Sequence, residues 1–341
     1  MTKGLTIKIA KGSIVTIAAT ILLSALFWFL PHFLLGGNSA EVPILFMGIE
    51  ILALPDWLSR LLAFLTWGVV WYLLNMKCNE LKIIPVRSAM VFILGMAFCS
   101  TIPIMQRFDG TMIAFLLFLT SFMNIFGLYD VRNQVTEVYR IMLLVLASSL
   151  FAPSYAWLSC VMFLGLLNFK VGSFRILMSI LLAIVTVAWL VWGICFCLGK
   201  TAMLMAWANS MLQFSLPSLH GSIICMVSSV LLLLAVITVI VAVNGISHTF
   251  DARVRLNCSF FYLAFFFTVA FIVFFPAART GMLPGIIVIA TVLSALYFSV
   301  AKSKFADTLF LIFIGLMIIY RVAVELPFLN LGILGYLGTL G

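Results

Sequence analysis

Long apolar runs separated by short polar breaks dominate the chain. A helix needs about 20 apolar residues to cross a hydrocarbon core of about 30 Å. The runs between charged residues or Pro/Gly breaks predict about eleven such spans. They lie near Ile14–Leu35, Leu58–Met76, Ser88–Met105, Thr111–Tyr129, Val138–Phe151, Ser154–Phe169, Ile176–Leu198, Ser222–Asn244, Cys258–Phe275, Leu283–Val300 and Thr308–Val324. The pattern predicts an all-α polytopic membrane protein that forms one transmembrane domain over residues 1–341.

Two of these runs are short, and only Ala152 and Pro153 separate them. Proline lacks a backbone N–H and ends or bends a helix. The region 138–169 is therefore two short spans, one long kinked span or a re-entrant pair, and the pattern does not choose among them.

Two further apolar stretches lie outside the predicted spans. Val42–Leu54 is apolar on all sides except at Glu50, and Thr201–Phe214 mixes Met, Leu and Trp with small polar residues. Such stretches are typical of helices that lie in the membrane interface. We expect one interfacial helix near 42–54 and another near 201–214.

Composition excludes several classes of protein. The chain is 65% hydrophobic and 9% charged, whereas a soluble domain carries about 25% charged residues. This excludes a soluble enzyme, a disordered chain and a nucleic-acid-binding domain. The formal net charge of +9 is then read as a topology signal, because cytoplasmic loops collect Lys and Arg.

The distribution of basic residues predicts the orientation. With the N-terminus in the cytoplasm, most of the 19 Lys and Arg fall on the cytoplasmic side, whereas the acidic residues divide evenly. The outer side receives only Arg60, Arg107, Lys200, Arg279 and Arg321. We expect a multi-pass protein of the bacterial inner membrane, with a cytoplasmic N-terminus and a periplasmic C-terminus.

The chain offers little intramembrane chemistry. No Asp or Glu falls at the middle of a predicted span, which argues against a transporter coupled to protons or sodium through a carboxylate. The seven cysteines are scattered and form no Cys/His pattern with metal-ligand spacing, so no metal site is predicted.

The candidate site is a group of charged residues on the predicted outer side. Arg60, Arg107, Arg279 and Arg321 suit a lipid phosphate, because the guanidinium fork pairs with phosphate oxygens. Glu50 and Glu41 are the candidate catalytic bases for an acceptor hydroxyl. These charges are otherwise ordinary solvated loop residues. Asp56, after Pro55, is predicted to cap the second span, and Asp109-Gly110 to form a turn before Thr111.

Part of the chain resembles a known family. The stretch Leu146-Ala-Ser-Ser-Leu-Phe-Ala-Pro-Ser154 precedes an apolar run and then Asn168-Phe-Lys-Val-Gly-Ser-Phe-Arg175. Further on, Gly281-Met-Leu-Pro284 precedes a span that is followed by Lys302-Ser-Lys304 and Phe305-Ala-Asp307. Over roughly residues 133–320 this resembles a family of polytopic proteins from Bacteroidota with a domain of unknown function. The resemblance implies an inner-membrane location and assigns no functional residue.

More loosely, the chain is similar to glycosyltransferases of the GT-C type. The shared features are an extended first outer loop with an interfacial helix, about eleven spans and a central segment of small residues, Pro and an apolar run. The chain departs from that type by lacking a D-D or E-x-D pair in the first outer loop and a large C-terminal periplasmic domain.

Two functions follow as hypotheses, and neither fixes whether the protein is an enzyme. The first is cell-envelope glycan or lipid-linked sugar assembly by a GT-C-like transferase that uses a polyprenyl-phosphate sugar. The alternative is a non-catalytic translocator of lipid or lipid-linked sugar, or a structural subunit of an envelope membrane complex. The expected partners are membrane lipids and the lipid-linked sugar; the sequence predicts neither the acceptor nor the oligomeric state.

Overall fold

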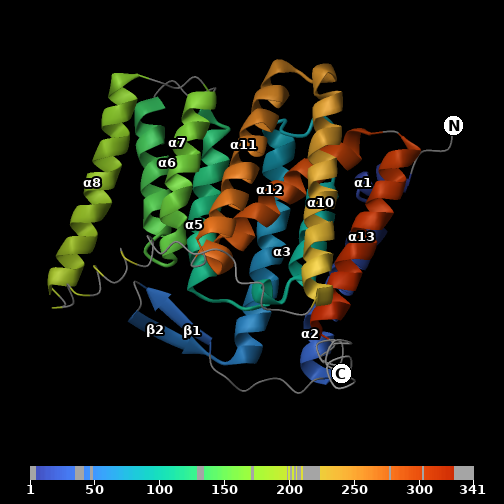
Figure 1. Cartoon of the computed structure of the whole chain (residues 1–341), viewed down its shortest axis with the longest axis horizontal. Coiled ribbons are helices and arrows are strands. Elements are labelled where there is room, and N and C mark those ends of the chain that lie inside the picture. Colours follow the sequence, from blue (N-terminus) through green and yellow to red (C-terminus); the bar gives the residue numbers. More distant parts are fainter. Residues whose placement is uncertain are drawn as a thin grey trace, which may run out of the picture.

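The computed structural model describes residues 5–34, 42–46, 49–128, 134–169, 173–197, 223–275, 278–301 and 303–325, with isolated positions between 199 and 209. In these residues the chain forms twelve α-helices and one two-stranded sheet (Figure 1). The helices are α1 (Leu5–Ala10), α2 (Ile14–Leu34), α3 (Asp56–Glu80), α4 (Met90–Thr101), α5 (Gly110–Ile125), α6 (Gln134–Ser148), α7 (Leu158–Asn168), α8 (Phe174–Cys197), α10 (Ile223–Ile246), α11 (Ala252–Phe274), α12 (Ala278–Val300) and α13 (Lys304–Glu325). The strands are β1 (Val42–Phe46) and β2 (Ile49–Leu54), and the 3₁₀ turns are η1 (Pro103–Gln106), η3 (Pro153–Trp157) and η4 (Ser247–Thr249).

Six of the described helices are long and apolar enough to cross a membrane. They are α3, α8, α11, most of α10 (Val230–Thr249, with η4), Gly281–Val300 of α12 and Lys304–Val322 of α13. The prediction of an all-α, multi-pass membrane protein is therefore confirmed. The number of about eleven spans and the orientation stay predictions.

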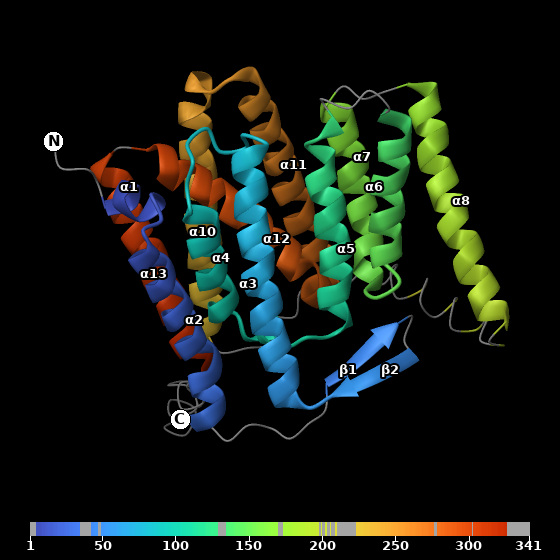
Figure 2. The same ribbon diagram turned by 180° about the vertical axis from the view of Figure 1, so that it is seen from behind.

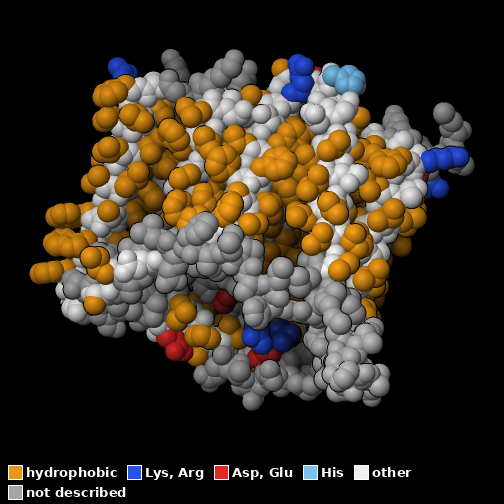
Figure 3. All heavy atoms as spheres, viewed as in Figure 1, with side chains coloured by type: hydrophobic (Ala, Val, Ile, Leu, Met, Phe, Trp, Pro, Cys, Tyr) orange, Lys and Arg blue, Asp and Glu red, His pale blue; other side chains and the backbone are white. Residues whose placement is uncertain are grey.

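The helices stand side by side, and successive helices run in opposite directions (Figures 1 and 2). The strand pair β1–β2 lies beyond one end of the bundle, and α1 lies toward the other. Figure 3 shows hydrophobic side chains over the middle of one face and charged side chains gathered toward its two ends. This distribution is what a helical protein in a bilayer requires, because charge belongs outside the hydrocarbon core.

Helix α12 is the centre of the bundle, since 83% of the residues in its apolar window are buried. Its Gly281 lies against η3 so closely that a Cβ there would collide with the Ser154 Oγ. The two residues come from the Gly281–Pro284 and Leu146–Ser154 stretches noted above. These two stretches therefore meet where α12 packs closely on η3.

The region 138–169 forms two helices, α6 and α7, joined by η3. Pro153 occupies the first turn of η3, where its missing N–H leaves no hydrogen bond unmade. The main-chain N–H groups of Phe151 and Ala152 both donate to Ser148 O, which closes the end of α6. One continuous kinked helix is therefore excluded.

The expected interfacial helix near 42–54 is wrong: this segment is the antiparallel pair β1–β2. Val42 pairs with Leu54 and Phe46 with Ile49, with an irregularity between Ile44 and Leu45. The pair packs on the bundle, because a Cβ at Gly110 of α5 would lie only 2.7 Å from Leu45 O. The second expected helix, 201–214, lies outside the described residues except at isolated positions.

Candidate functional site

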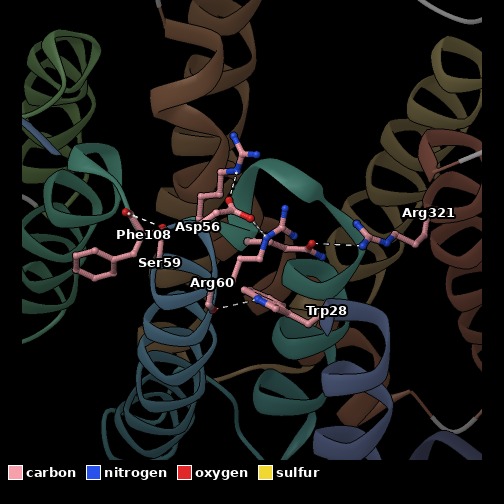
Figure 4. Close-up of polar contacts among 8 residues, drawn as sticks. Trp28, Asp56, Ser59, Arg60, Phe108 and Arg321 are labelled. Atoms are coloured by element: carbon pink, nitrogen blue, oxygen red, sulfur yellow. Dashed lines mark hydrogen bonds and ion pairs between the residues drawn. The ribbon is translucent and has the colours of Figure 1, made fainter. Parts of the chain in front are cut away.

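A cluster of charged side chains lies where α2, α3, η1 and α13 meet, at the end of the bundle near the strand pair (Figures 1 and 4). We call Asp56, Arg60, Gln106, Arg107 and Arg321 the arginine cluster. The Arg60 Nε lies 2.8 Å from the Asp56 Oδ2, and the Arg107 Nε lies 3.4 Å from the Asp56 Oδ1. Each oxygen of this one carboxylate therefore faces a different arginine.

Asp56 occupies the first turn of α3 but does not cap it, contrary to the sequence prediction. The N-cap is Pro55, and no side-chain hydrogen bond caps the helix. The Asp56 carboxylate turns to the two arginines instead, and Asp56 is only 5% exposed. Its position still favours a negative charge, because the N-terminus of a helix carries partial positive charge.

Arg60 follows Asp56 by four residues, the spacing that places two side chains on the same face of a helix. The main-chain carbonyl of Arg60 accepts a 3.2 Å hydrogen bond from the Trp28 Nε1, and the Trp28 side chain of α2 is fully buried. This contact fixes α2 against the turn of α3 that carries Arg60.

The segment that carries Gln106 and Arg107 is held by hydrogen bonds to α3. The Trp67 Nε1 donates to Met105 O at 3.0 Å. The Ser59 hydroxyl accepts from Phe108 N at 2.8 Å and donates to Phe108 O at 3.1 Å. These bonds lie on both sides of Arg107 in the sequence, so they position Arg107 beside Asp56.

Arg321 brings α13 into the cluster. Its Nη2 donates to Phe27 O of α2 at 2.9 Å and to the Gln106 Oε1 at 3.3 Å. The Gln106 Nε2 in turn donates to Ser100 O at 2.9 Å. Arg321 is 3% exposed, and Figure 4 shows its side chain pointing from α13 toward the region of Arg60.

The cluster carries three guanidinium groups and one carboxylate, and so an excess of positive charge. Burying an arginine within a membrane bundle costs at least about 2.5–3.5 kcal/mol unless it is paired or reaches water. Arg60 and Arg321 are largely buried, whereas the Arg107 side chain is 45% exposed. Arg107 therefore marks the side from which a solute reaches the cluster.

The predicted site residues do not all meet. Arg60, Arg107 and Arg321 share the cluster, whereas Glu50 lies on β2, exposed, and makes no side-chain hydrogen bond or ion pair with any described residue. Glu41 lies outside the described residues. Arg279 lies in the first turn of α12, and the position of its side chain is not described.

Some residues of the site carried no strong signal in the sequence. The Asp56–Arg60 spacing of four residues was visible. The roles of Trp28 and Gln106 were not visible in the sequence, because their hydrogen-bond partners are main-chain carbonyls or residues far along the chain.

Asp109, two residues after Arg107, was expected to form a turn with Gly110 before Thr111. It is the N-cap of α5, and its side chain accepts hydrogen bonds from Met112 N at 3.2 Å and from the Thr111 hydroxyl at 2.6 Å. Both hydrogen bonds stabilise the start of α5, so Asp109 is not part of the arginine cluster.

An apolar cavity of about 340 Å³ lies next to the cluster, between α4, α10, α11, α12 and α13. Its wall includes Thr101 and Ile102, which directly precede η1, and Tyr320, which directly precedes Arg321. Leu283 also lines it, one helical turn after Arg279. The cavity thus shares two chain segments with the arginine cluster, the one that leads into η1 and the one that carries Arg321.

The chemistry of the cluster is that of an anion site. Within the described ranges, no group of three or more His, Cys, Asp or Glu residues is placed to hold a metal ion. Guanidinium groups bind phosphate or carboxylate through paired hydrogen bonds. Fold and site together define a multi-pass helical membrane protein with an arginine-rich polar site at one end of its bundle. Comparisons with protein-family models, curated proteins and solved structures find no match to the chain.

Proposed function

We propose that the protein belongs to cell-envelope glycan assembly and binds a polyprenyl-phosphate-linked sugar at the arginine cluster. The proposed setting is the bacterial inner membrane, with about eleven spans, a cytoplasmic N-terminus and a periplasmic C-terminus. The observation that carries the proposal is that the described side chains of the arginine cluster include three guanidinium groups and one carboxylate.

The cluster suits the phosphate of such a lipid. Within the described side chains of the cluster, three guanidinium groups accompany the single carboxylate of Asp56, so an anion that enters beside Arg107 meets a positive field. Guanidinium groups are the favoured partners of phosphate in proteins, because two N–H groups match two oxygens. The pairing is strengthened where the surroundings exclude water.

The neighbouring cavity suits part of the lipid chain. Its volume of about 340 Å³ is within the range of small-molecule sites, and its lining residues other than Thr101 and Tyr320 are apolar. A phosphate held at the cluster places the attached hydrocarbon beside Ile102 and Tyr320. The same region then serves a charged headgroup and an apolar tail.

The transfer step, in the GT-C-like form of this proposal, needs a general base. Asp56 is a poor choice because both of its oxygens already face arginines, whereas a base must lie about 2.6–3.2 Å from the proton that it removes. Glu50 and Glu41 keep this role in the proposal. Glu50 extends from the strand pair at the same end of the bundle.

One observation favours the second candidate, a non-catalytic carrier or translocator of the same lipid or a structural subunit. Glu50 contacts no cation among the described residues, so the described part of the chain does not bring this candidate base against the arginines. Binding without transfer needs only the arginines and the cavity.

The test uses the full chain in nanodiscs and a polyprenyl-phosphate sugar. Arg107→Gln is the first variant, because its exposed side chain is the least involved in packing. We expect its Kd to rise about tenfold, the loss of one charge-assisted contact of about 1.5 kcal/mol. Arg255→Gln is the control, an exposed arginine on α11 at the other end of the bundle.

Binding and transfer are scored separately. Equal affinity of Arg107→Gln and the unaltered protein contradicts the proposed site. If binding is lost in Arg107→Gln, transfer to an acceptor is measured with Glu50→Gln. Loss of transfer with retained binding supports the transferase, and absence of transfer in the unaltered protein supports the carrier.

A further inference from the structure

A groove of about 540 Å³ lies between α3 and α5, in the half of the bundle away from the strand pair. Its apolar walls come from one face of α3 and one face of α5, and its charged residues, from α3 and α6, gather at one end. The lining consists of Val70, Leu73, Leu74, Lys77, Leu81, Leu116, Leu119, Thr120, Met123, Asn124, Gly127, Glu137 and Arg140. We call it the α3–α5 groove.

The groove is closed toward the middle of the bundle. There the Trp67 ring of α3 packs on the Phe115 ring of α5, with centroids 4.9 Å apart. Both rings are fully buried; Phe115 directly precedes the lining residue Leu116, and Trp67 lies three residues before the lining residue Val70. The two helices therefore touch at this aromatic contact and leave the space between them beyond it.

The open end of the groove carries the charges. Lys77 pairs with Glu80 at 2.7 Å, and Arg140 pairs with Glu137 at 2.9 Å. The Lys77 and Arg140 side chains are 53% and 56% exposed, and exposed pairs of this kind are worth only about 0–1 kcal/mol. Both cations can therefore turn to an anion at little cost.

The length of the groove matches one leaflet of a bilayer. From Trp67 to Lys77 the helix rises about 15 Å, at 1.5 Å per residue. Half of a hydrocarbon core of about 30 Å is the same distance. A chain that enters beside Lys77 reaches the aromatic stop at the depth where an acyl chain of that leaflet ends.

We propose that the α3–α5 groove is a binding site for a membrane glycerophospholipid. One acyl chain lies between α3 and α5 down to the Trp67–Phe115 contact, and the phosphodiester lies between Lys77 and Arg140. Glu137 at the same end accepts from an ammonium where the headgroup has one. This site is at the opposite end from the arginine cluster and stands without the function proposed above.

The test is photo-cross-linking of the full chain in liposomes that contain a lipid with a diazirine on one acyl chain. The probe is used in two phospholipid forms, phosphatidylethanolamine and phosphatidylglycerol, and as diacylglycerol, which lacks the phosphate. We expect both phospholipids to label peptides from 70–81 and 116–127, and diacylglycerol to label them less. Labelling by one phospholipid alone also supports the site and defines the headgroup.

Two kinds of variant test the two parts of the site. Leu73→Trp fills the groove and should remove the label from 116–127. Its control is Leu65→Trp on the same helix, where a 55% exposed leucine lies outside the groove.

The charged end is tested separately. Lys77→Gln with Arg140→Gln should weaken labelling about fivefold per cation at limiting probe. Arg175→Gln, an exposed cation at the same end on α8, should leave it unchanged.

Several results would overturn the proposal. These are uniform labelling of all lipid-facing helices, equal effects of Leu73→Trp and Leu65→Trp, or equal labelling by diacylglycerol and the phospholipids. Thermal unfolding and a single elution peak establish that each variant is folded. If Leu73→Trp is not, Thr120→Phe fills the groove from its other wall, at an exposed position.

Discussion

The guanidinium of Arg321 donates a 2.9 Å hydrogen bond to the main-chain carbonyl of Phe27, across 294 residues of sequence. It therefore joins the last described helix, α13, to the first long one, α2. Because the Gln106 Oε1 accepts from the same nitrogen, one side chain holds α2, α13 and η1 together.

Replacing Arg321 by Met should destabilise the protein. Phe27 O and the Gln106 Oε1 would lose a charged donor in a buried place, which costs about 1–3 kcal/mol. The free energy of unfolding, measured by denaturant titration in micelles, should fall by that amount. Arg255→Met, at an exposed position, should change it by less than about 0.5 kcal/mol. Equal values for the two variants would contradict a tie through Arg321.

Gly281→Ala should also destabilise the protein, because its Cβ would collide with the Ser154 Oγ. Overpacking of this kind costs about 1–3 kcal/mol. With Ser154→Ala in addition, the new methyl group meets only atoms at 3.6 Å or beyond, so the double variant should recover stability. Gly193→Ala on α8 is the control, since nothing lies within 4 Å of its added Cβ. A double variant as unstable as Gly281→Ala alone would disprove the clash.

Asp307→Ala should release α1 from α13. The Asp307 carboxylate accepts from Leu5 N at 3.2 Å, Thr6 N at 2.9 Å and the Thr6 hydroxyl at 2.8 Å. These bonds cap α1, and loss of a cap costs about 0.5–2 kcal/mol. Amide hydrogen exchange of residues 5–10 should accelerate. Asp251→Ala is the control. Asp251 precedes α11 and accepts none of the hydrogen bonds from Leu5 and Thr6, so its replacement should leave that exchange unchanged.

Glu50 and Arg175 should face opposite sides of the membrane. They lie on β2 and at the start of α8, at opposite ends of the bundle (Figure 1). In a cysteine-free background, Glu50→Cys in intact cells should react with a membrane-impermeant maleimide. Arg175→Cys should react only after the cells are opened. Reaction of both in intact cells would refute the proposed orientation.

The apolar runs predicted the helices well, because in a bilayer the solvent itself demands about 20 apolar residues for each crossing. They failed at Val42–Leu54, where an apolar run has no polar face to reveal its period. The β-branched residues Val42, Ile44, Ile49 and Ile51, on either side of Met47-Gly48, were the available sign of two strands.

The arginines of the site were predicted on one side of the membrane, but their partners were not. Asp56 was assigned to a cap from its neighbours in sequence, whereas Arg107, 51 positions later, provides one of its ion pairs. Glu50 was chosen as a carboxylate in an apolar stretch, and the strand pair leaves it exposed. Local patterns place a residue along its own helix and say nothing of which distant segment returns to it.

The tie between Phe27 and Arg321 has a consequence for biosynthesis. A ribosome adds about 5–20 residues per second, so roughly 15–60 s pass between synthesis of the acceptor and of its donor. For that interval the Phe27 carbonyl waits for its final partner, and a nascent chain that stops short of Arg321 never acquires it. Ribosomal pausing shortly before residue 321 would therefore prolong the interval in which the precursor lacks the hydrogen bond that joins α2 to α13.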